Sequence, residues 1–265
     1  MVDLAGGLHA LPPLTNSKNM PTGAVYGVAN ILRKLMAEYP EADVVVVFDA
    51  PGKTFRDDWY PEYKAQRAPM PPELRAQIEP IHEVVKLLGW PVLMVPGVEA
   101  DDVIGTLCCV GANAGHKVIV STGDKDLSQL VNPDVELINT MSNERLDEAG
   151  VLAKFGVPPD RIIDYLTLMG DTVDNVPGVV GVGPKTAAKW IAEYGSLDGV
   201  IAAAPGVKGK AGENLRAHRL GINGVPCFIV NRKYAVSGAQ PPSAFVEVFN
   251  LAERDAATSA AQSTA

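Results

Sequence analysis

Val44-Val45-Val46-Val47-Phe48-Asp49 is the most informative stretch of this 265-residue chain, because a continuous β-branched run leads directly into a carboxylate. Such a run is typical of a strand that is buried on both faces of a parallel sheet. Further apolar runs predict strands at 91–95, 117–121 and, more weakly, 135–138. Segments with helical apolar spacing lie between them at 72–88 and 101–114. The alternation predicts an α/β fold, with a parallel sheet and helices on both faces.

Composition excludes several classes of protein. The hydrophobic share is 47% and the net charge is -8, and no apolar run approaches the roughly 18 residues of a membrane span. The first residues carry neither a basic start nor a long apolar stretch, so we expect a cytoplasmic protein without a membrane partner. The three cysteines form no C-x-x-C pair, which argues against a disulfide framework, a zinc site or a dithiol enzyme, and we expect them to be small buried hydrophobes.

Eight carboxylates gather in four short motifs. Two motifs follow the ends of predicted strands, one begins the helix at 101–114, and one follows a glycine that ends a predicted helix at 159–169. The residues are Asp49, Glu99, Asp101, Asp102, Asp124, Asp126, Asp171 and Asp174. Ligands of an open α/β sheet bind beyond the carboxyl ends of its strands, so we expect these loops to converge. Oxygen-only ligands favour Mg²⁺ or Mn²⁺, and two such ions suit phosphodiester hydrolysis.

A glycine-rich hairpin forms the second constellation. Asp174 to Ala187 reads as a helix end, a turn and a new helix that begins at Pro184. Gly181 and Gly183 would let backbone N–H groups approach a phosphate, and Lys185 and Thr186 stand at the new helix N-terminus. Residues 185–219 carry six Lys or Arg against three Asp or Glu. This balance favours a surface that binds the DNA backbone irrespective of sequence.

Four motifs together resemble a known family. They are Phe48-Asp49-Ala50-Pro51-Gly52-Lys53-Thr54-Phe55-Arg56, Gly97-Val98-Glu99-Ala100-Asp101-Asp102, Ser121-Thr122-Gly123-Asp124-Lys125-Asp126, and Leu168-Met169-Gly170-Asp171 through Gly183. In order and spacing, residues 8–219 resemble the 5′–3′ exonuclease domain of bacterial DNA polymerase I, a relative of flap endonucleases. The resemblance implies a PIN-like sheet and a helix-hairpin-helix that binds duplex DNA and commonly a K⁺ ion. It also implies a helical arch that threads the 5′ single strand.

The resemblance assigns roles to individual residues. All eight carboxylates become metal-site residues, directly or through water. The residues that match the arch and its entrance, where cations would grip the scissile phosphate and a ring could stack on a base, are Lys53, Arg56, Tyr63, Lys64 and Arg67. Without the resemblance, Lys64 and Arg67 read as solvated helix charges. The implied domains are a catalytic domain at 1–150 and a helix-hairpin-helix subdomain at 151–219.

Both ends of the chain depart from that family. The family has a strand ending in Val-Asp-Gly-Ser and a helix before the His9-to-Leu14 motif, whereas this chain has only a short segment there, with Asp3 as the candidate for the strand's terminal Asp. Residues 220–251 resemble the C-terminal end of DsbA-like thioredoxin-fold oxidoreductases, and within them we expect a strand at 228–230 and a short amphipathic helix at 244–251. Residues 252–265 read as a disordered tail.

Three functions therefore remain open from the sequence. The first is a metal-dependent 5′–3′ exonuclease and flap endonuclease acting on DNA in replication and repair, as a monomer, on substrates that a DNA polymerase also uses. The second is a structure-specific DNA-binding protein whose catalysis is impaired by the short N-terminal strand. The third is a thiol oxidoreductase, which the missing C-x-x-C disfavours.

Overall fold

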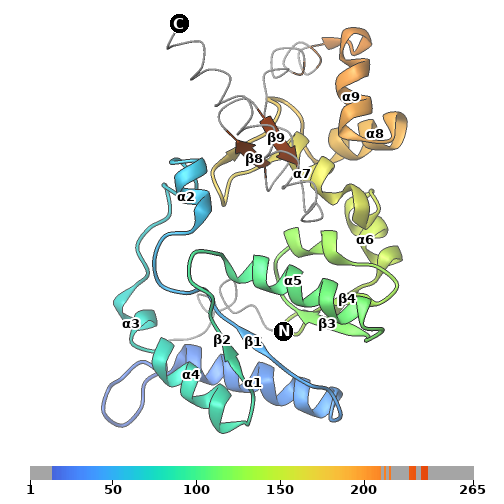
Figure 1. Ribbon diagram of the computed structural model, residues 1–265. Coiled ribbons are helices and arrows are strands. Elements are labelled where there is room, and N and C mark those ends of the chain that lie inside the picture. Colours follow the sequence, from blue (N-terminus) through green and yellow to red (C-terminus); the bar gives the residue numbers. More distant parts are fainter. Residues whose placement is uncertain (1–13, 210–211, 213–214, 216–226, 231–233, 238–265) are drawn as a thin grey trace, which may run out of the picture. The chain divides into compact units, whose positions relative to one another are not determined.

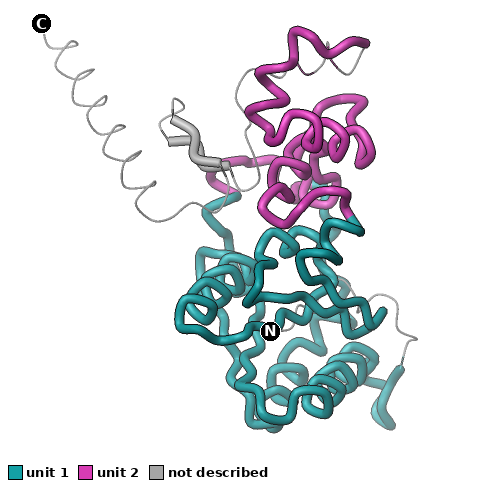
Figure 2. The backbone as a smooth tube through the Cα atoms, turned by 90° about the vertical axis from the view of Figure 1, so that its right-hand side faces the viewer, with its two compact units in different colours: residues 1–56, 66–154 teal, residues 57–65, 155–265 magenta. Residues whose placement is uncertain are grey.

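A computed structural model of the protein describes residues 14–209, 212, 215, 227–230 and 234–237. They fall into two compact units, which are coloured separately in Figure 2. Unit 1 comprises residues 1–56 and 66–154, and unit 2 comprises residues 57–65 and 155–265. In the part of the chain that is described, no helix combines the length and the apolar character needed to cross a membrane.

Unit 1 is an α/β unit (Figure 1). Its elements are α1 (Gly23–Glu38), β1 (Val46–Val47), α3 (Pro72–Arg75), α4 (Ile78–Leu87), β2 (Val92–Leu93), α5 (Ala100–Asn113), β3 (Val118–Ser121), the 3₁₀-helix η2 (Asp126–Leu130), β4 (Val135–Asn139), β5 (Glu144–Leu146) and most of α6 (Glu148–Phe155). Two of these helices pack on the strands, since α4 contacts β2 and α5 contacts both β1 and β3. The predicted strands and helices thus alternate as expected.

The strands of unit 1 form two sheets within the described residues. β1 pairs in parallel with β2, with Val46 opposite Val92. β3 pairs in parallel with β4, and β5 joins β4 in the antiparallel sense, with Leu137 opposite Leu146. The predicted strands are confirmed in place, but β1 and β2 are two residues long instead of five, and the antiparallel β5 was not predicted.

Burial on both faces explains the β-branched run. Val46 is 0% exposed and Val47 is 2% exposed, although successive side chains of a strand point to opposite faces. Val46 packs among Val28 and Leu32 of α1 and Val85 of α4. The alternation then turns Val47 toward the other face of the strand, on the side opposite that cluster. A strand so placed needs apolar residues at successive positions, as its sequence has.

One predicted helix is broken for a reason. The segment 72–88 was expected to be continuous, but it is divided into α3 and α4 at Ala76 and Gln77. Pro80 accounts for the break, because its ring clashes with the carbonyl four residues earlier in a continuous helix. The side chain of Gln77, which lies at this break, is buried, and its Oε1 accepts hydrogen bonds from Ala24 N (2.8 Å) and Val25 N (3.3 Å). These N–H groups open α1 and have no acceptor within that helix.

Two other expectations need correction. The helix α1 was not predicted, although Ala24, Val28, Leu32 and Leu35 form a buried stripe along it. Of the cysteines expected to be buried, Cys108 is, and its burial raises the pKa of its thiol to about 11, whereas Cys109 is exposed. Neighbouring positions of a helix point in directions about 100° apart, so one helix cannot bury both at a single face.

Unit 2 is mostly helical. Its elements are the end of α2 (Phe55–Trp59), the 3₁₀-helix η3 (Pro159–Arg161), α7 (Ile162–Met169), β6 (Gly170–Asp171), β7 (Val176–Pro177), α8 (Pro184–Tyr194), α9 (Leu197–Ala203), η4 (Ala204–Gly206), β8 (Cys227–Val230) and β9 (Tyr234–Ser237). α7 packs on α8 and α9, and α8 packs on α9. The predicted helices at 159–169 and after Pro184 are confirmed, the first with a 3₁₀ turn at its start.

The chain ends lie largely outside the described residues. β8 and β9 form an antiparallel pair, so the strand expected at 228–230 is present. The residues of the other predicted end features are outside the description: Asp3 and the N-terminal segment, the helix expected at 244–251, and the tail at 252–265.

His82 makes the stability of unit 1 depend on pH. It is 6% exposed, and its ring meets Phe48 edge-on with 4.4 Å between centroids. Burial lowers the pKa of His82, with a smaller raising effect from Glu79 and a lowering effect from Lys86. The folded state therefore favours the neutral ring, and this stability is complete above the unfolded-state pKa of about 6.5 and is lost as pH falls below it.

We expect the free energy of unfolding to fall more between pH 7.5 and pH 5.5 in the wild type than in His82→Leu, because the variant has no ring to protonate. Urea titrations at the two pH values measure the difference. Equal losses in both proteins would contradict the assignment.

Gly178 allows the β6–β7 hairpin to close. A Cβ at this position would lie 2.0 Å from Met169 C and 2.2 Å from Gly170 N. Gly178→Ala should therefore lower the free energy of unfolding by about 3 kcal/mol, as measured by chemical denaturation. Gly206→Ala is the matched control, since a Cβ there meets nothing within 4 Å. Similar stability of the two variants would show that the backbone has room to relax at Gly178.

Candidate active site

Asp49 connects the end of β1 to the start of α5. Its Oδ1 accepts a hydrogen bond from Ala100 N at 2.7 Å, and Ala100 is the first residue of that helix. A carboxylate at this end of a helix also benefits from the helix dipole. The contact brings the predicted strand-end carboxylate to the motif at 99–102, although the two are about fifty positions apart in the sequence.

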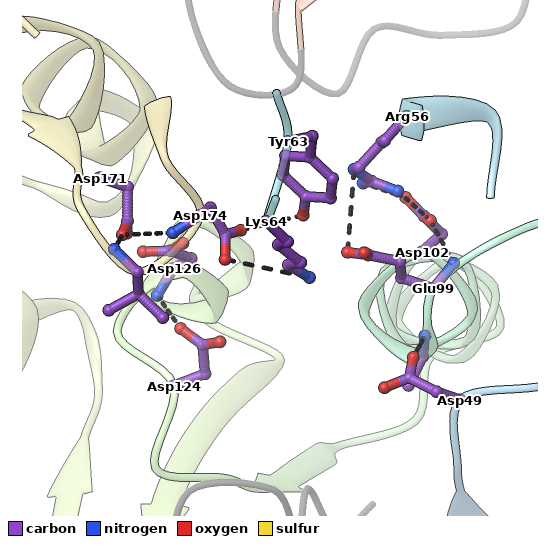
Figure 3. A network of polar contacts seen from close by, with 12 residues as sticks. Asp49, Arg56, Tyr63, Lys64, Glu99, Asp102, Asp124, Asp126, Asp171 and Asp174 are labelled. Carbon is purple, nitrogen blue, oxygen red and sulfur yellow. Dashed lines mark hydrogen bonds and ion pairs between the residues drawn. The ribbon is translucent and has the colours of Figure 1, made fainter. Parts of the chain in front are cut away.

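Glu99, Asp102 and Arg56 form a connected group of polar contacts in unit 1 (Figure 3). Arg56 donates from Nη1 and Nη2 to the two carboxylate oxygens of Asp102 at 2.6 and 2.7 Å, and its Nε lies 3.9 Å from Glu99 Oε2. Asp102 Oδ2 also accepts from Glu99 N at 2.9 Å, as the third residue of α5 does in a capping box. The forked guanidinium matches the carboxylate geometry. Asp101 is half-buried in the same helical turn.

Asp124 and Asp126 follow β3 through a tight turn. Thr122 Oγ1 accepts from Asp124 N at 2.9 Å, and Asp124 Oδ1 accepts from Asp126 N at 2.8 Å. Lys125 Nζ lies 3.1 Å from Asp126 Oδ1. Short side chains that bond the backbone two residues away are typical of such turns. The geometry fixes both carboxylates at the end of the strand, where the sequence predicted them.

Asp171 and Asp174 lie in one turn of unit 2. Asp171 is buried, and its Oδ1 accepts from Val173 N (2.7 Å) and Asp174 N (3.2 Å). Asp174 Oδ2 accepts from Tyr63 OH at 2.9 Å, and its Oδ1 lies 3.9 Å from Lys64 Nζ. Figure 3 shows Tyr63 and Lys64 turned toward this carboxylate. Two residues assigned to the arch thus contact a residue assigned to the metal site.

Sequence reasoning missed two residues at this site, Asn175 of the turn and Tyr60, which contacts it. Asn175 has a left-handed backbone, with φ of 59°, and donates from Nδ2 to Glu62 O at 2.7 Å. Tyr60 OH lies 3.1 Å from Asn175 O and 3.4 Å from Glu62 Oε2. Burial, and then the charge of Glu62, raise the pKa of Tyr60, so the hydroxyl stays protonated. The one available signal was Asn in a turn-rich stretch, since Asn tolerates left-handed backbone.

The predicted site residues are brought together only in part. The ones that share contacts are Asp49 with the start of α5, Arg56 with Glu99 and Asp102, Asp124 with Asp126, and Asp171 with Asp174, Tyr63 and Lys64. Lys53 and Arg67 are exposed, while Tyr63 is 9% exposed, with Lys64 Nζ 4.7 Å from the centre of its ring. Among the described residues, no group of three or more His, Cys, Asp or Glu is arranged to hold a metal ion.

The glycine hairpin has the predicted helix–turn–helix form. α7 leads through β6 and β7 into a turn in which Val182 N donates to Val179 O at 2.9 Å. Gly181 is left-handed, with φ of 85°, and Gly183 caps α8 just before Pro184. Gly183 O accepts from Thr186 N and Ala187 N, both at 3.0 Å. Lys185 and Val180 are exposed. The turn therefore presents glycine backbone and one cation beside a helix N-terminus.

Comparison with family models matches nearly all of the described chain. Residues 7–156 match the model described as 5′-3′ exonuclease, N-terminal resolvase-like domain, and residues 157–223 match 5′-3′ exonuclease, C-terminal SAM fold. The resemblance of residues 220–251 to DsbA-like oxidoreductases is not supported, because the helical C-terminal model of the exonuclease extends to residue 223 and accounts for the start of that segment.

Individual relatives agree. DNA polymerase I of Pseudomonas aeruginosa is 54% identical over 218 residues, which are 78% of this chain but 24% of that protein. A 5′-3′ exonuclease of Aquifex aeolicus is 48% identical over 192 residues, covering 72% of this chain and 66% of that one. The chain thus spans a quarter of the first relative and about two thirds of the second.

Solved structures show the same fold. The T5 5′-exonuclease with bound divalent zinc is 25% identical with a TM-score of 0.60, covering 73% of this chain and 76% of that one. The catalytic core of Rad2 in complex with a DNA substrate is 18% identical with a TM-score of 0.51, covering 80% and 67%. The second likeness concerns fold alone. The PIN-like α/β fold with a helical C-terminal part is confirmed, and the chain belongs to the 5′-3′ exonuclease family.

Proposed function

We propose that the protein is a metal-dependent nuclease that hydrolyses DNA phosphodiester bonds, as a 5′–3′ exonuclease and 5′-flap endonuclease in replication and repair. The observation that carries the proposal is the set of three carboxylate pairs on loops that end a strand or flank a helix: Glu99 with Asp102, Asp124 with Asp126, and Asp171 with Asp174. Membership of the exonuclease family over residues 7–223 supports it.

The donor atoms of these pairs fit a hard divalent cation. They are carboxylate oxygens, without Cys or His, which suits Mg²⁺ or Mn²⁺. The residues that would hold the ions, two of them in the two-metal scheme, are the six members of the pairs together with Asp49 and Asp101. Bound divalent ions activate a water molecule and stabilise the charge that develops on a scissile phosphate. A relative of the family, the T5 5′-exonuclease, was solved with divalent ions.

Arg56, Lys64 and Tyr63 act on the phosphate in this proposal. In the described conformation Arg56 is bonded to Asp102, and Tyr63 and Lys64 contact Asp174. The guanidinium of Arg56 and the ammonium of Lys64 are the cations that would bind the phosphate oxygens, with Lys53 and Arg67 as further cations of the arch.

The hairpin supplies binding that does not depend on sequence. Gly181 and Gly183 leave the backbone open to a phosphate, and the N-terminus of α8 with Lys185 and Thr186 favours negative charge. The Rad2 core, which shares the fold, was solved with DNA. A K⁺ ion at this hairpin stays a prediction from the resemblance. A monomeric chain, a cytoplasmic location and a DNA polymerase that acts on the same substrate stay predictions from the sequence.

Binding without cleavage is the second candidate function. The observation that favours it is the division of the strand ladder into two sheets among the described residues, beside a complete α7–hairpin–α8 arrangement. A wild-type protein that binds a 5′-flap duplex but leaves it intact with Mg²⁺ and with Mn²⁺ would establish this function in place of the first.

Asp126→Asn should reduce cleavage of a 5′-flap substrate in Mg²⁺ on the order of 100-fold, because a charged ligand is lost. Duplex binding, measured by fluorescence anisotropy in EDTA, should be unchanged because it depends on the hairpin. Asp134→Asn is the matched control, since Asp134 pairs with Lys117 at the surface of unit 1 and is not a proposed ligand. Cleavage by Asp126→Asn at the control's rate would show that the metal assignment is wrong.

Lys185→Ala should weaken duplex binding equally for unrelated sequences, because the side chain meets the phosphate backbone. The slope of log K against log salt should become shallower by about 0.9, the value for one lost phosphate contact. Lys117→Ala, which removes an exposed cation of unit 1, should leave the slope unchanged. A change of sequence preference in Lys185→Ala would contradict readout of the backbone alone.

A further inference from the structure

Unit 2 contains a set of contacts between two segments that are far apart in the sequence. One is the 60–64 segment, Tyr60 to Lys64, and the other is the acidic turn, Asp171 to Asn175. Their contacts are Tyr60 OH to Asn175 O (3.1 Å), Asn175 Nδ2 to Glu62 O (2.7 Å), Lys64 N to Asp174 O (3.1 Å), Tyr63 OH to Asp174 Oδ2 (2.9 Å) and the Lys64–Asp174 ion pair (3.9 Å). Backbone and side chains of both segments take part.

Asn175 contributes two of these contacts, one through its side chain and one through its backbone carbonyl. Its side-chain amide donates to the backbone of Glu62, while its own carbonyl accepts from Tyr60. Both depend on its left-handed backbone at φ 59°, which is uncommon for residues other than Gly, Asn and Asp. Asp also tolerates this conformation but has no N–H to donate, and Gly has no side chain. Asn is the residue that supplies both the backbone geometry and the donor.

The contacts of Asn175 determine where Lys64 and Tyr63 stand. Glu62 O lies only two residues before Lys64, whose backbone is also left-handed, with φ of 53°, and whose N–H is bonded to Asp174 O. The other side of the contact has its own hydrogen bonds, because Asp171 Oδ1 accepts from the N–H groups of Val173 and Asp174. With Glu62 held by Asn175, the chain delivers the Tyr63 hydroxyl and the Lys64 ammonium to the Asp174 carboxylate.

We propose that Asn175 is a positioning residue. Its two hydrogen bonds, called the clasp below, join the 60–64 segment to the acidic turn and thereby place Lys64 and Tyr63 against Asp174. For the chemistry, this inference rests on the proposed nuclease function. Asn175 does not touch the phosphate in this scheme, and its effect passes through Lys64. Its loss therefore slows the chemical step and leaves the affinity for DNA unchanged, because that affinity comes from the hairpin after Gly178.

Asn175→Gly keeps the left-handed backbone and removes the amide, and Asn175→Asp keeps the size and removes the donor. Asn143→Gly is the matched control, since Asn143 is left-handed as well, with φ of 61°, but lies in the β4–β5 turn of unit 1. Tyr60→Phe removes the second contact without changing Asn175. Tyr60→Phe replaces the Asn175 variants in both measurements if an Asn175 variant fails to fold.

The first measurement does not require catalysis. The rate at which an amine reagent modifies Lys64 is followed by mass spectrometry on the full chain, with exposed Lys53 as the internal reference. We expect the Lys64-to-Lys53 ratio to rise about 5- to 10-fold in both Asn175 variants, as for the loss of one hydrogen bond, and to stay constant in Asn143→Gly. An unchanged ratio in the Asn175 variants overturns the clasp, whether or not the protein cuts DNA.

The second measurement tests the consequence for catalysis. On a 5′-flap substrate with Mg²⁺, kcat of Asn175→Gly should fall about tenfold with KM within twofold of the wild type. The double variant with Lys64→Met should be no slower than Lys64→Met alone, because Asn175 acts through Lys64. A raised labelling ratio with unchanged kcat overturns the positioning role. A wild type that does not cleave overturns the proposed function, and the labelling ratio then decides the clasp by itself.

Discussion

Repulsion between neighbouring carboxylates is the constraint that shapes the loops of this protein. A carboxylate that lies beside another is stabilised by a nearby cation or by N–H donors. In the described structure the partners are Arg56 for Asp102, Lys64 for Asp174, and backbone N–H groups for Asp49, Asp124 and Asp171. Asp124 and Asp171 are thus held within their own loops, whereas Asp49, Asp102 and Asp174 are held by residues from distant parts of the chain.

The same bonds link the acids to the groups proposed to bind substrate. Arg56 makes a two-pronged contact with Asp102, and its side chain is 14% exposed. Lys64 and Tyr63 make the corresponding contacts on Asp174 in the other unit. A change in the charge of these carboxylates therefore alters the freedom of the cations at once. In the proposed nuclease, the arch and the metal-binding loops cannot act independently, because they share these ion pairs.

Much of the fold follows from local patterns. The run at 44–48 requires burial on both faces, and Gly183-Pro184 marks the start of α8, so both were readable from the chain alone. The break between α3 and α4 could be predicted from Pro80, but the role of the residue at the break could not. Gln77 caps α1 across 53 positions of sequence, and hydrogen bonds over that distance leave no periodic signal. The antiparallel β5 was missed for a similar reason, since strand direction depends on pairing.

For the site, the sequence by itself determined the identity of the acids, their placement on loops after strands and helices, and the glycine hairpin. These are properties of residue type and local spacing, and the comparisons agree on the family that they indicate. Only the tertiary structure decided that Arg56 bonds Asp102, 46 positions away, and that Asn175 and Tyr60 join Lys64 to Asp174 across more than 100 positions. Such contacts depend on how the packed helices and strands bring distant loops together, and residue type and local spacing do not specify that arrangement.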